Sequence, residues 1–561
     1  MTVIPNAHTK VPMMFRAQAQ GRCQVQRILN RAGQEEDIQR WTTEWTWQID
    51  EAVPQFGDRV QTRDYQVNWR LLTNGGQDDT VIRPLLGARG WPFFPGSSMK
   101  GLFRRACSGE QAKDYCGLQA ADGYEPGSLR FHGGYPTDAS WTERLEDIVH
   151  PQQDYQVGMS GNKTGALAAI SLYRPLMRFG ISAEKSLSDS QWQEVWQIWE
   201  RAIASGLGGR TCAGYGQVVG RAQGTLLFRG SLWGQGAAAK LLDGSGEFRP
   251  NLFRAALRGH ALRIFGGLTT EESAVRLVEK LFGGVRGGAT VGLLGMEFEL
   301  RALEMGSFGR DRYRVPTYEV TGELRWRLLR ELPEEKRRAL QRLMVFLTRF
   351  AVLLGGFGKS WRRADHRLFF KEYYPNWSEG MGSDRKPLIG CQWDWADGRS
   401  LRQGRLKLQS VGKFIDAVRQ AAAKWMEECE FSVEGPYPHW REVWHPETVQ
   451  VWGRRAVNPH LNPEECHAAA WLHGPYRSPN YTIAKSSVTG HLGQVGRLWH
   501  RLYAIAVPKD RKADPKTAEY VKTKNYNELL TLFPDGSETF DEFLEFLETR
   551  SEFEKLWPLE Q

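Results

Sequence analysis

The chain has 561 residues, of which 41% are hydrophobic and 25% are charged, and its formal net charge is +9. This length predicts more than one hydrophobic core, and the composition is typical of globular proteins rather than disordered or fibrous ones. No apolar run approaches the roughly 20 residues of a membrane-spanning helix, and Met1–Asn6 lacks the features of a secretory signal, so we expect a cytoplasmic protein without a membrane partner.

The first predicted element is a strand at Val67–Leu72, followed by a loop at residues 74–79 with the sequence Asn-Gly-Gly-Gln-Asp-Asp. Two glycines in this loop permit positive φ and a close approach of a ligand to the backbone. The excess of basic over acidic residues, 74 against 65, suits a polyanionic ligand. We therefore expect a phosphate backbone to lie against this loop.

The next predicted element is a basic helix that opens at Pro95-Gly96. A serine follows at each of the next two positions, and either could be the N-cap that precedes the outward-facing N–H groups of a helix start. Anions bind at such starts, and basic side chains follow within two turns. The predicted phosphate contacts of this helix are Ser97, Ser98, Lys100, Arg104 and Arg105.

These two segments, GGQDDTVIR (Gly75–Arg83) and FFPGSSMKGLFR (Phe93–Arg104), resemble the signature of CRISPR-associated RAMP proteins, the backbone subunits of type III effector complexes. The resemblance implies an α+β fold with two tandem ferredoxin-like (RRM-like) domains, thumb insertions and a C-terminal extension. It also implies CRISPR guide RNA, complementary target RNA and other CRISPR-associated subunits as partners. In that family the glycine-rich loop carries the aspartate needed for metal-dependent target cleavage, and Asp78 is the residue that matches, with Asp79 beside it.

Chemistry at Asp78 would use the nucleophile that RNA already carries, the 2′-hydroxyl beside the scissile phosphate. Aspartate is ionised at neutral pH, so Asp78 is expected either to bind a divalent metal, Mg2+, or to accept a hydrogen bond from that hydroxyl. An Asx-type turn stabilised by its own carboxylate is the structural alternative. Alignment of the two copies described below places Ala238 opposite Asp78, with Asp243 as a displaced second candidate.

A polar loop from His150 to Gly165, which includes Gln152, precedes a predicted strand at Ala168–Tyr173. By the resemblance this loop is the thumb, which interrupts the guide–target duplex. His150 could then transfer a proton, or it could be a structural loop residue. A helix predicted at Gln191–Ser205 runs into the glycine-rich segment 206–216, which either binds RNA or forms a tight turn. The RNA contacts that the resemblance implies here are Gly208, Gly209 and Arg210.

A second copy of this pattern follows. A basic helix opens at Pro250, and a helix predicted at Glu334–Ala351 runs into another glycine cluster at 355–358, with strands predicted at Thr225–Leu232 and Val320–Leu328. The same order of elements at similar spacing indicates duplication. The expected domains are 1–222, 223–370 and a C-terminal region 371–561 that completes the second domain. The second copy's predicted RNA contacts are Arg249, Arg254, Arg258, Lys359, Arg362 and Arg363.

Two segments of the C-terminal region are informative. Lys485–Arg497 is rich in glycine, serine and threonine, and it is either a phosphate-binding loop or an ordinary turn. Near the end, Thr539 and Glu542 have the spacing of a capping box, and Phe540, Phe543 and Leu547 share one helical face. We expect this helix to dock on a neighbouring protein.

The leading hypothesis is a guide-RNA-binding subunit that cleaves complementary target RNA, an RNA-guided endoribonuclease of a type III effector complex. Base pairing would select the target, and the protein would hold the backbone. One alternative is a backbone subunit that binds RNA and cuts nothing. The other is a guide-maturing endonuclease of the same fold, which would work without metal.

Overall fold

The computed structural model describes 35–47, 49, 52–73, 75–78, 81–120, 123–149, 167–220, 224–241, 244–284, 290–309, 314–365, 390–404, 406–491, 494–510, 512, 514 and 517–559. The chain forms two compact units, the first mainly of residues up to Gly224 and the second mainly of residues from Thr225 onward. The expected boundary at 222/223 lies beside this division. Among the described helices, none has the length and apolar character to cross a bilayer.

The main sheet of the first unit, sheet A, is antiparallel with the strand order β1-β11-β7. Helix α6 starts with a capping box between Ser188 and Gln191, and its Trp199 packs on Phe179 of the sheet with 5.1 Å between ring centroids. The three strands of sheet A and the helices between and after them are β1 (Gln61–Gln66), α4 (Gly96–Ala106), α5 (Gly109–Cys116), β7 (Leu129–Pro136), β11 (Leu176–Ala183) and α6 (Asp189–Ile203).

A second sheet of this unit, which we call the Asp78 sheet, has the order β3-β4-β9-β8, with β4 and β9 parallel. Its strands are β3 (Gln77–Asp78), β4 (Val81–Ile82), β8 (Glu146–Val149) and β9 (Leu167–Ile170). The remaining elements of the unit are α3 (Glu35–Trp47), β2 (Arg70–Leu71), β5 (Gly117–Ala120), β6 (Gly123–Pro126) and β10 (Leu172–Tyr173).

The strand expected at Val67–Leu72 does not form as one element. The chain bends between β1 and β2, because the Asn68 N–H donates to the Gln217 carbonyl at 2.8 Å and the buried Trp69 ring packs on Tyr215 at 4.6 Å. The helix expected at Gln191–Ser205 is confirmed as α6.

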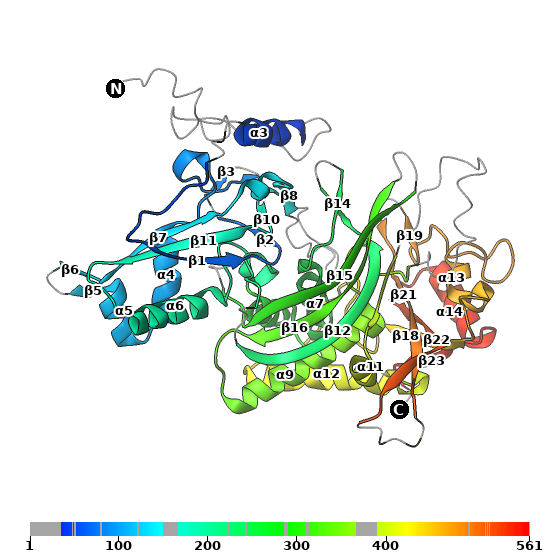
Figure 1. Cartoon of the computed structure of the whole chain (residues 1–561). Helices are drawn as coiled ribbons and strands as arrows, with labels where there is room; N and C mark the ends of the chain where they lie inside the picture. Colours follow the sequence, from blue (N-terminus) through cyan, green and yellow to red (C-terminus); the bar gives the residue numbers. More distant parts are fainter. Residues whose placement is uncertain are drawn as a thin grey trace. The chain divides into compact units, whose positions relative to one another are not determined.

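The second unit contains a long antiparallel sheet, sheet B, with the order β15-β16-β12-β17. Figure 1 shows β15, β16 and β12 side by side. If its four strands are numbered by their order along the chain, they stand side by side in the sheet as second, third, first and fourth. Helices α7 and α8 follow the first strand, and α9 follows the third. The elements are β12 (Thr225–Ala237), β13 (Ala239–Lys240), β14 (Gly246–Glu247), α7 (Asn251–Gly266), α8 (Glu271–Phe282), β15 (Leu294–Phe308), β16 (Val315–Leu328), α9 (Glu334–Phe350) and β17 (Cys391–Trp395).

The C-terminal region builds a further antiparallel sheet, sheet C, with the order β21-β22-β18-β23. Its strands again stand in the order second, third, first, fourth, with α13 after the first and α14 after the third. The region expected to complete the second domain therefore gives β17 to sheet B and forms a sheet of its own. Its elements are α11 (Gly398–Gly404), α12 (Val411–Glu428), β18 (Gln450–Ala456), α13 (His467–Trp471), β19 (Gly490–His491), β20 (Gln494–Val495), β21 (Leu498–Pro508), β22 (Tyr520–Leu532), α14 (Glu538–Thr549) and β23 (Glu554–Trp557).

The expectation that the last helix docks on another protein is wrong. Phe540, Phe543 and Leu547 of α14 are fully buried in a core that they share with Trp471 of α13 and residues of sheet C. The predicted capping box is also absent, because the N-cap of α14 is Ser537. The apolar face that the sequence shows is thus covered by the chain itself.

Candidate nucleic-acid interface

Asp78 lies in an antiparallel hairpin of the first unit. Its Cα partner is Val81 on β4, and the base of the hairpin is closed by the Gly75 N–H, which donates to the Arg83 carbonyl at 2.9 Å. Just outside this pair, the Leu85 N–H donates a hydrogen bond of 2.8 Å to the Thr73 hydroxyl. The backbone of Asp78 is therefore fixed on the edge strand β3 of the Asp78 sheet.

The glycine-rich loop that follows α6 packs on the strand segment leading into this hairpin. The Gly209 N–H donates to the Leu72 carbonyl at 3.0 Å, and the Gly216 N–H donates to the Arg70 carbonyl at 2.6 Å. Gly208 has φ +71°, and a Cβ there would lie 1.9 Å from the Leu72 oxygen, so only glycine fits. The exposed Arg210 follows Gly209 directly, so this packing places its backbone near Leu72, on the segment that leads into the Asp78 hairpin.

The same loop is also tied to the Asp78 sheet by a buried side-chain bond. The Tyr215 hydroxyl donates to the Asp147 carboxylate on β8 at 2.7 Å, and both side chains are buried. Neither residue was predicted from the sequence. An aspartate in an apolar strand, as in Glu146-Asp147-Ile148-Val149, is the signal that could have drawn attention to it, because a buried carboxylate needs a donor.

Helix α4 begins two or three residues earlier than expected, and no side chain caps it. Pro95 is the N-cap, and Ser97 and Ser98 lie exposed in the first turn, so the expected serine N-cap is wrong. Gly96 allows this start, because a Cβ there would lie 2.0 Å from the Phe131 carbonyl oxygen.

The basic residues of α4 are split along the helix. Lys100 is half-buried, whereas Arg104 and Arg105 are in the last turn, at the end opposite the serines. Arg104 also donates to the Gly117 carbonyl at 2.9 Å. The helix therefore offers two separate groups of donors rather than one.

The predicted contacts of the second copy are largely engaged within the protein. Arg249 is buried with its Nε 3.5 Å from Glu247, and Arg254 donates to the Phe282 carbonyl. Arg258 is half-buried, and Lys359 is exposed.

Two adjacent arginines after α9 are also held by protein groups. Arg362 pairs with Glu442 at 2.9 Å, and Arg363 donates to the Thr489 carbonyl at 2.8 Å.

The second glycine cluster is a structural turn. Gly355 and Gly356 are buried, and their carbonyls accept hydrogen bonds from Arg501 at 2.6 Å and His260 at 3.1 Å. Burial and the positive charge of Arg263 lower the pKa of His260 to about 3, so its ring is neutral near pH 7. Side chains of the same unit, His260 and Arg501, therefore cover the first two glycines of this cluster.

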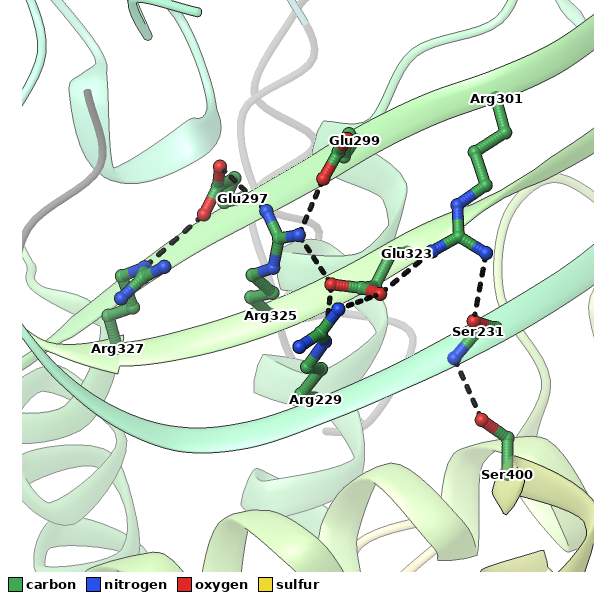
Figure 2. A network of polar contacts seen from close by, with 9 residues as sticks. All are labelled: Arg229, Ser231, Glu297, Glu299, Arg301, Glu323, Arg325, Arg327 and Ser400. Carbon is green, nitrogen blue, oxygen red and sulfur yellow. Dashed lines mark hydrogen bonds and ion pairs between the residues drawn. The ribbon is translucent and has the colours of Figure 1, made fainter. Parts of the chain in front are cut away.

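A network of arginines and glutamates covers the face of sheet B opposite its core (Figure 2). Glu323 is 3% exposed and accepts from Arg229 at 2.7 Å, Arg301 at 2.9 Å and Arg325 at 2.5 Å. Burial would raise the pKa of Glu323, but the hydrogen bond from Arg229 and the charge of Arg325 hold it below its ordinary value. With Glu297 and Glu299 also present, the positive charges are nearly balanced, so we assign this network a role in sheet stability.

Several predicted residues lie outside the described part of the chain. The side chain of Asp78 is among the undescribed ones, although its backbone is placed. The undescribed candidates are Asp79, His150, Gln152 and Asp243. Within the described residues there is no group of three or more His, Cys, Asp or Glu side chains that could hold a metal ion.

Comparisons with known proteins give a limited similarity. No family model matches the chain, and no curated protein matches it. Among solved structures, the chain is similar to part of a chain in the cryo-EM structure of type III-B Cmr-beta bound to cognate target RNA, with 17% sequence identity and a TM-score of 0.22. The match covers 28% of this chain and 56% of that chain, so it spans about half of the matched protein's length.

Proposed function

We propose that the protein is a guide-RNA-binding backbone subunit of a type III CRISPR effector complex, and that its first unit cleaves complementary target RNA at Asp78. The observation that carries the proposal is the packing of the glycine-rich loop on Leu72, with Gly209 bonded to the Leu72 carbonyl at 3.0 Å. It joins the Asp78 hairpin, whose sequence resembles RAMP proteins, to the loop that bears Arg210, where the resemblance implies RNA contacts.

The strand order supports the fold part of this proposal. Sheets B and C each follow the β-α-β-β-α-β order of the ferredoxin-like motif. Sheet A has the corresponding first three strands, and an isolated bridge between Val67 and Val218 stands where a fourth strand would pair. We propose that all three sheets are ferredoxin-like domains, one more than the resemblance implied.

The proposed role of Asp78 is to orient the RNA at the scissile phosphate. The hairpin would hold its carboxylate at an edge strand, where RNA can approach from solvent, and Arg210 would contact a neighbouring phosphate. Mg2+, which takes oxygen ligands from one or two carboxylates, phosphates and water, fits a single aspartate beside RNA better than a cage of protein ligands. When bound, the ion would neutralise charge that develops on the phosphate during cleavage.

The test is cleavage by the assembled ribonucleoprotein. Asp78→Ala should abolish metal-dependent cleavage of a complementary RNA while guide binding and assembly persist. Asp58→Ala, at an exposed aspartate of the same unit, is the matched control and should cut normally. Asp79→Ala and Asp243→Ala test the two other candidates.

The two alternatives give different results in the same assay. A backbone subunit that cuts nothing would bind guide RNA and leave target RNA intact in the wild-type assembly. A guide-maturing endonuclease would cleave precursor RNA in the presence of a chelator, and its activity would depend on a residue such as His150.

A further inference from the structure

Three arginines of the second unit, Arg263, Arg362 and Arg441, pair with the buried carboxylate of Glu442, and two more on adjoining segments complete a cluster of five. Arg263 donates to Glu442 at 2.7 Å, and Arg362 donates to it at 2.9 Å while stacking on the Trp361 ring. The other members are Arg363, Arg441 and Arg497, which come from three different loops. These residues are up to 234 positions apart in the sequence, so only the folded chain brings them together.

The loops are fastened to one another by their arginines. Arg363 donates to the Thr489 carbonyl at 2.8 Å, and Arg441 donates to the Gly496 carbonyl at 2.9 Å. Arg497 donates in turn to the Arg441 carbonyl at 3.4 Å. The segment Lys485–Arg497, for which the sequence allows a phosphate loop or a turn, therefore meets the arginines that follow the second glycine cluster.

In the described part of this segment, two backbone N–H groups are already bonded within the segment. The Gly490 N–H donates to the Ser486 carbonyl at 2.7 Å, and the Arg497 N–H donates to the Val488 carbonyl at 2.9 Å. A turn is thus the correct description of the backbone. Any anion bound here would be held by the guanidinium groups.

The arginines outnumber the carboxylates that neutralise them. In the described part of the chain, Glu442 and Asp535 are the carboxylates within ion-pair distance of this cluster, and Asp535 reaches only Arg497, at 3.7 Å. Arg363 has no carboxylate that close among the described residues. Like charges repel strongly where water is excluded, so an excess of guanidinium groups favours binding of an anion.

The lowered pKa values of two arginines reflect the same crowding of positive charge and burial. Burial and the neighbouring Arg362 lower the pKa of Arg363 to about 10, and burial also lowers the pKa of Arg441. The cluster nevertheless remains open to solvent, because the side chains of Arg441 and Arg497 are 17% and 21% exposed.

We propose that Arg363, Arg441 and Arg497 bind a phosphate group where their three loops meet. Guanidinium groups suit this ligand because their planar N–H donors match phosphate oxygens. The phosphate could belong to the RNA backbone or to a free nucleotide. For RNA, the inference rests on the proposed function, whereas for a nucleotide it stands alone.

The test uses the full chain with Asp78→Asn, so that RNA is not cut. Binding of inorganic phosphate, ADP and a 5′-phosphorylated hexaribonucleotide is measured by calorimetry and by the rise in melting temperature that a ligand of the folded state produces. We expect at least one of them to bind, and Arg441→Gln with Arg497→Gln to weaken that binding about tenfold or more.

Arg455→Gln, at an exposed arginine of β18, is the matched control and should change affinity less than about twofold. Melting temperatures without ligand show whether the variants fold, and Arg497→Lys, which keeps the charge, should bind better than Arg497→Gln. The proposal is overturned if none of the three ligands binds, or if the control loses as much affinity as the double variant.

The source of the phosphate follows from which ligand binds. Binding of the hexaribonucleotide alone assigns the site to RNA, and binding of ADP or phosphate alone assigns it to a free nucleotide. A chain that binds ADP here but no guide RNA would keep this inference and refute the proposed function. A chain that cleaves target RNA but binds none of the three ligands would keep the proposed function and refute this inference.

Discussion

The Tyr215 hydroxyl and the Asp147 carboxylate lie 2.7 Å apart and are both buried, and this bond joins the glycine-rich loop to the sheet that carries Asp78. Asp147 is on β8, at one edge of that sheet, and Asp78 is on β3, at the other. The loop that bears Arg210 and the hairpin that contains Asp78 are therefore joined through one hydrogen-bonded sheet.

Tyr215→Phe should destabilise the first unit. It removes one donor from a buried carboxylate, which typically costs about 1–3 kcal/mol. Urea unfolding followed by circular dichroism measures the loss. Tyr481→Phe, at a half-buried tyrosine in the second unit, should change the free energy of unfolding by less than about 0.5 kcal/mol. Equal stability of the Tyr215→Phe variant and the wild type would show that the bond is unimportant.

Gly208→Ala should weaken RNA binding by displacing the glycine-rich loop. The new methyl group would meet the Leu72 carbonyl oxygen at 1.9 Å, and φ at this position is +71°. We expect about a tenfold loss of guide-RNA affinity in a filter-binding assay.

Gly101→Ala in α4 is the control for this glycine substitution. A Cβ at Gly101 meets nothing within 4 Å, so this variant should bind RNA normally and gain about 0.5–1 kcal/mol of stability from helix propensity. Normal binding by Gly208→Ala would remove the loop from the proposed interface.

Local sequence patterns predicted the elements whose signals are local. Helix α6 has a Ser-x-x-Gln start and apolar residues at helical spacing, and it forms at Asp189–Ile203. Strand β12 likewise begins at Thr225, as predicted, although it runs on to Ala237. Such elements depend on contacts within a few residues, and these can be read from one chain.

The sequence could not show what covers each motif. Gly355 and Gly356 look like an anion-binding turn, but His260 and Arg501, which are distant in the sequence, occupy the space around them. The same limitation hid Glu442, because its partners Arg263 and Arg362 come from other elements. Long-range packing therefore decided that Gly355 and Gly356 are covered.

His260 should make the second unit less stable as the pH falls. Burial and Arg263 lower its pKa to about 3 in the folded chain, whereas an unfolded histidine has its ordinary pKa of 6.5. Below pH 6.5 the unfolded state gains a proton that the folded state does not, so stability is lost as the pH falls from 6.5 toward 3. The loss should reach about 1.4 kcal/mol per pH unit in urea unfolding. His260→Gln should lack this part of the pH dependence, and an unchanged slope would contradict a buried neutral ring.

Glu442→Gln should destabilise the second unit strongly, because it leaves Arg263 and Arg362 without their carboxylate. Removing one partner of a buried ion pair costs about 3–5 kcal/mol. Burial would raise the pKa of Glu442, but the charges of Arg362 and Arg263 outweigh it and hold the pKa below its ordinary value of 4.5. The stabilisation is therefore complete above about pH 5 and is lost as the pH falls further.

Urea unfolding at pH 7 and at pH 3.5 measures both effects of Glu442→Gln. The gap in unfolding free energy between wild type and variant should be large at pH 7 and smaller at pH 3.5. Glu434→Gln, at an exposed glutamate of the same unit, should change stability little at either pH. A gap that stays constant with pH would mean that Glu442 acts through packing rather than through its charge, and the arginines around it would then need another source of neutralisation.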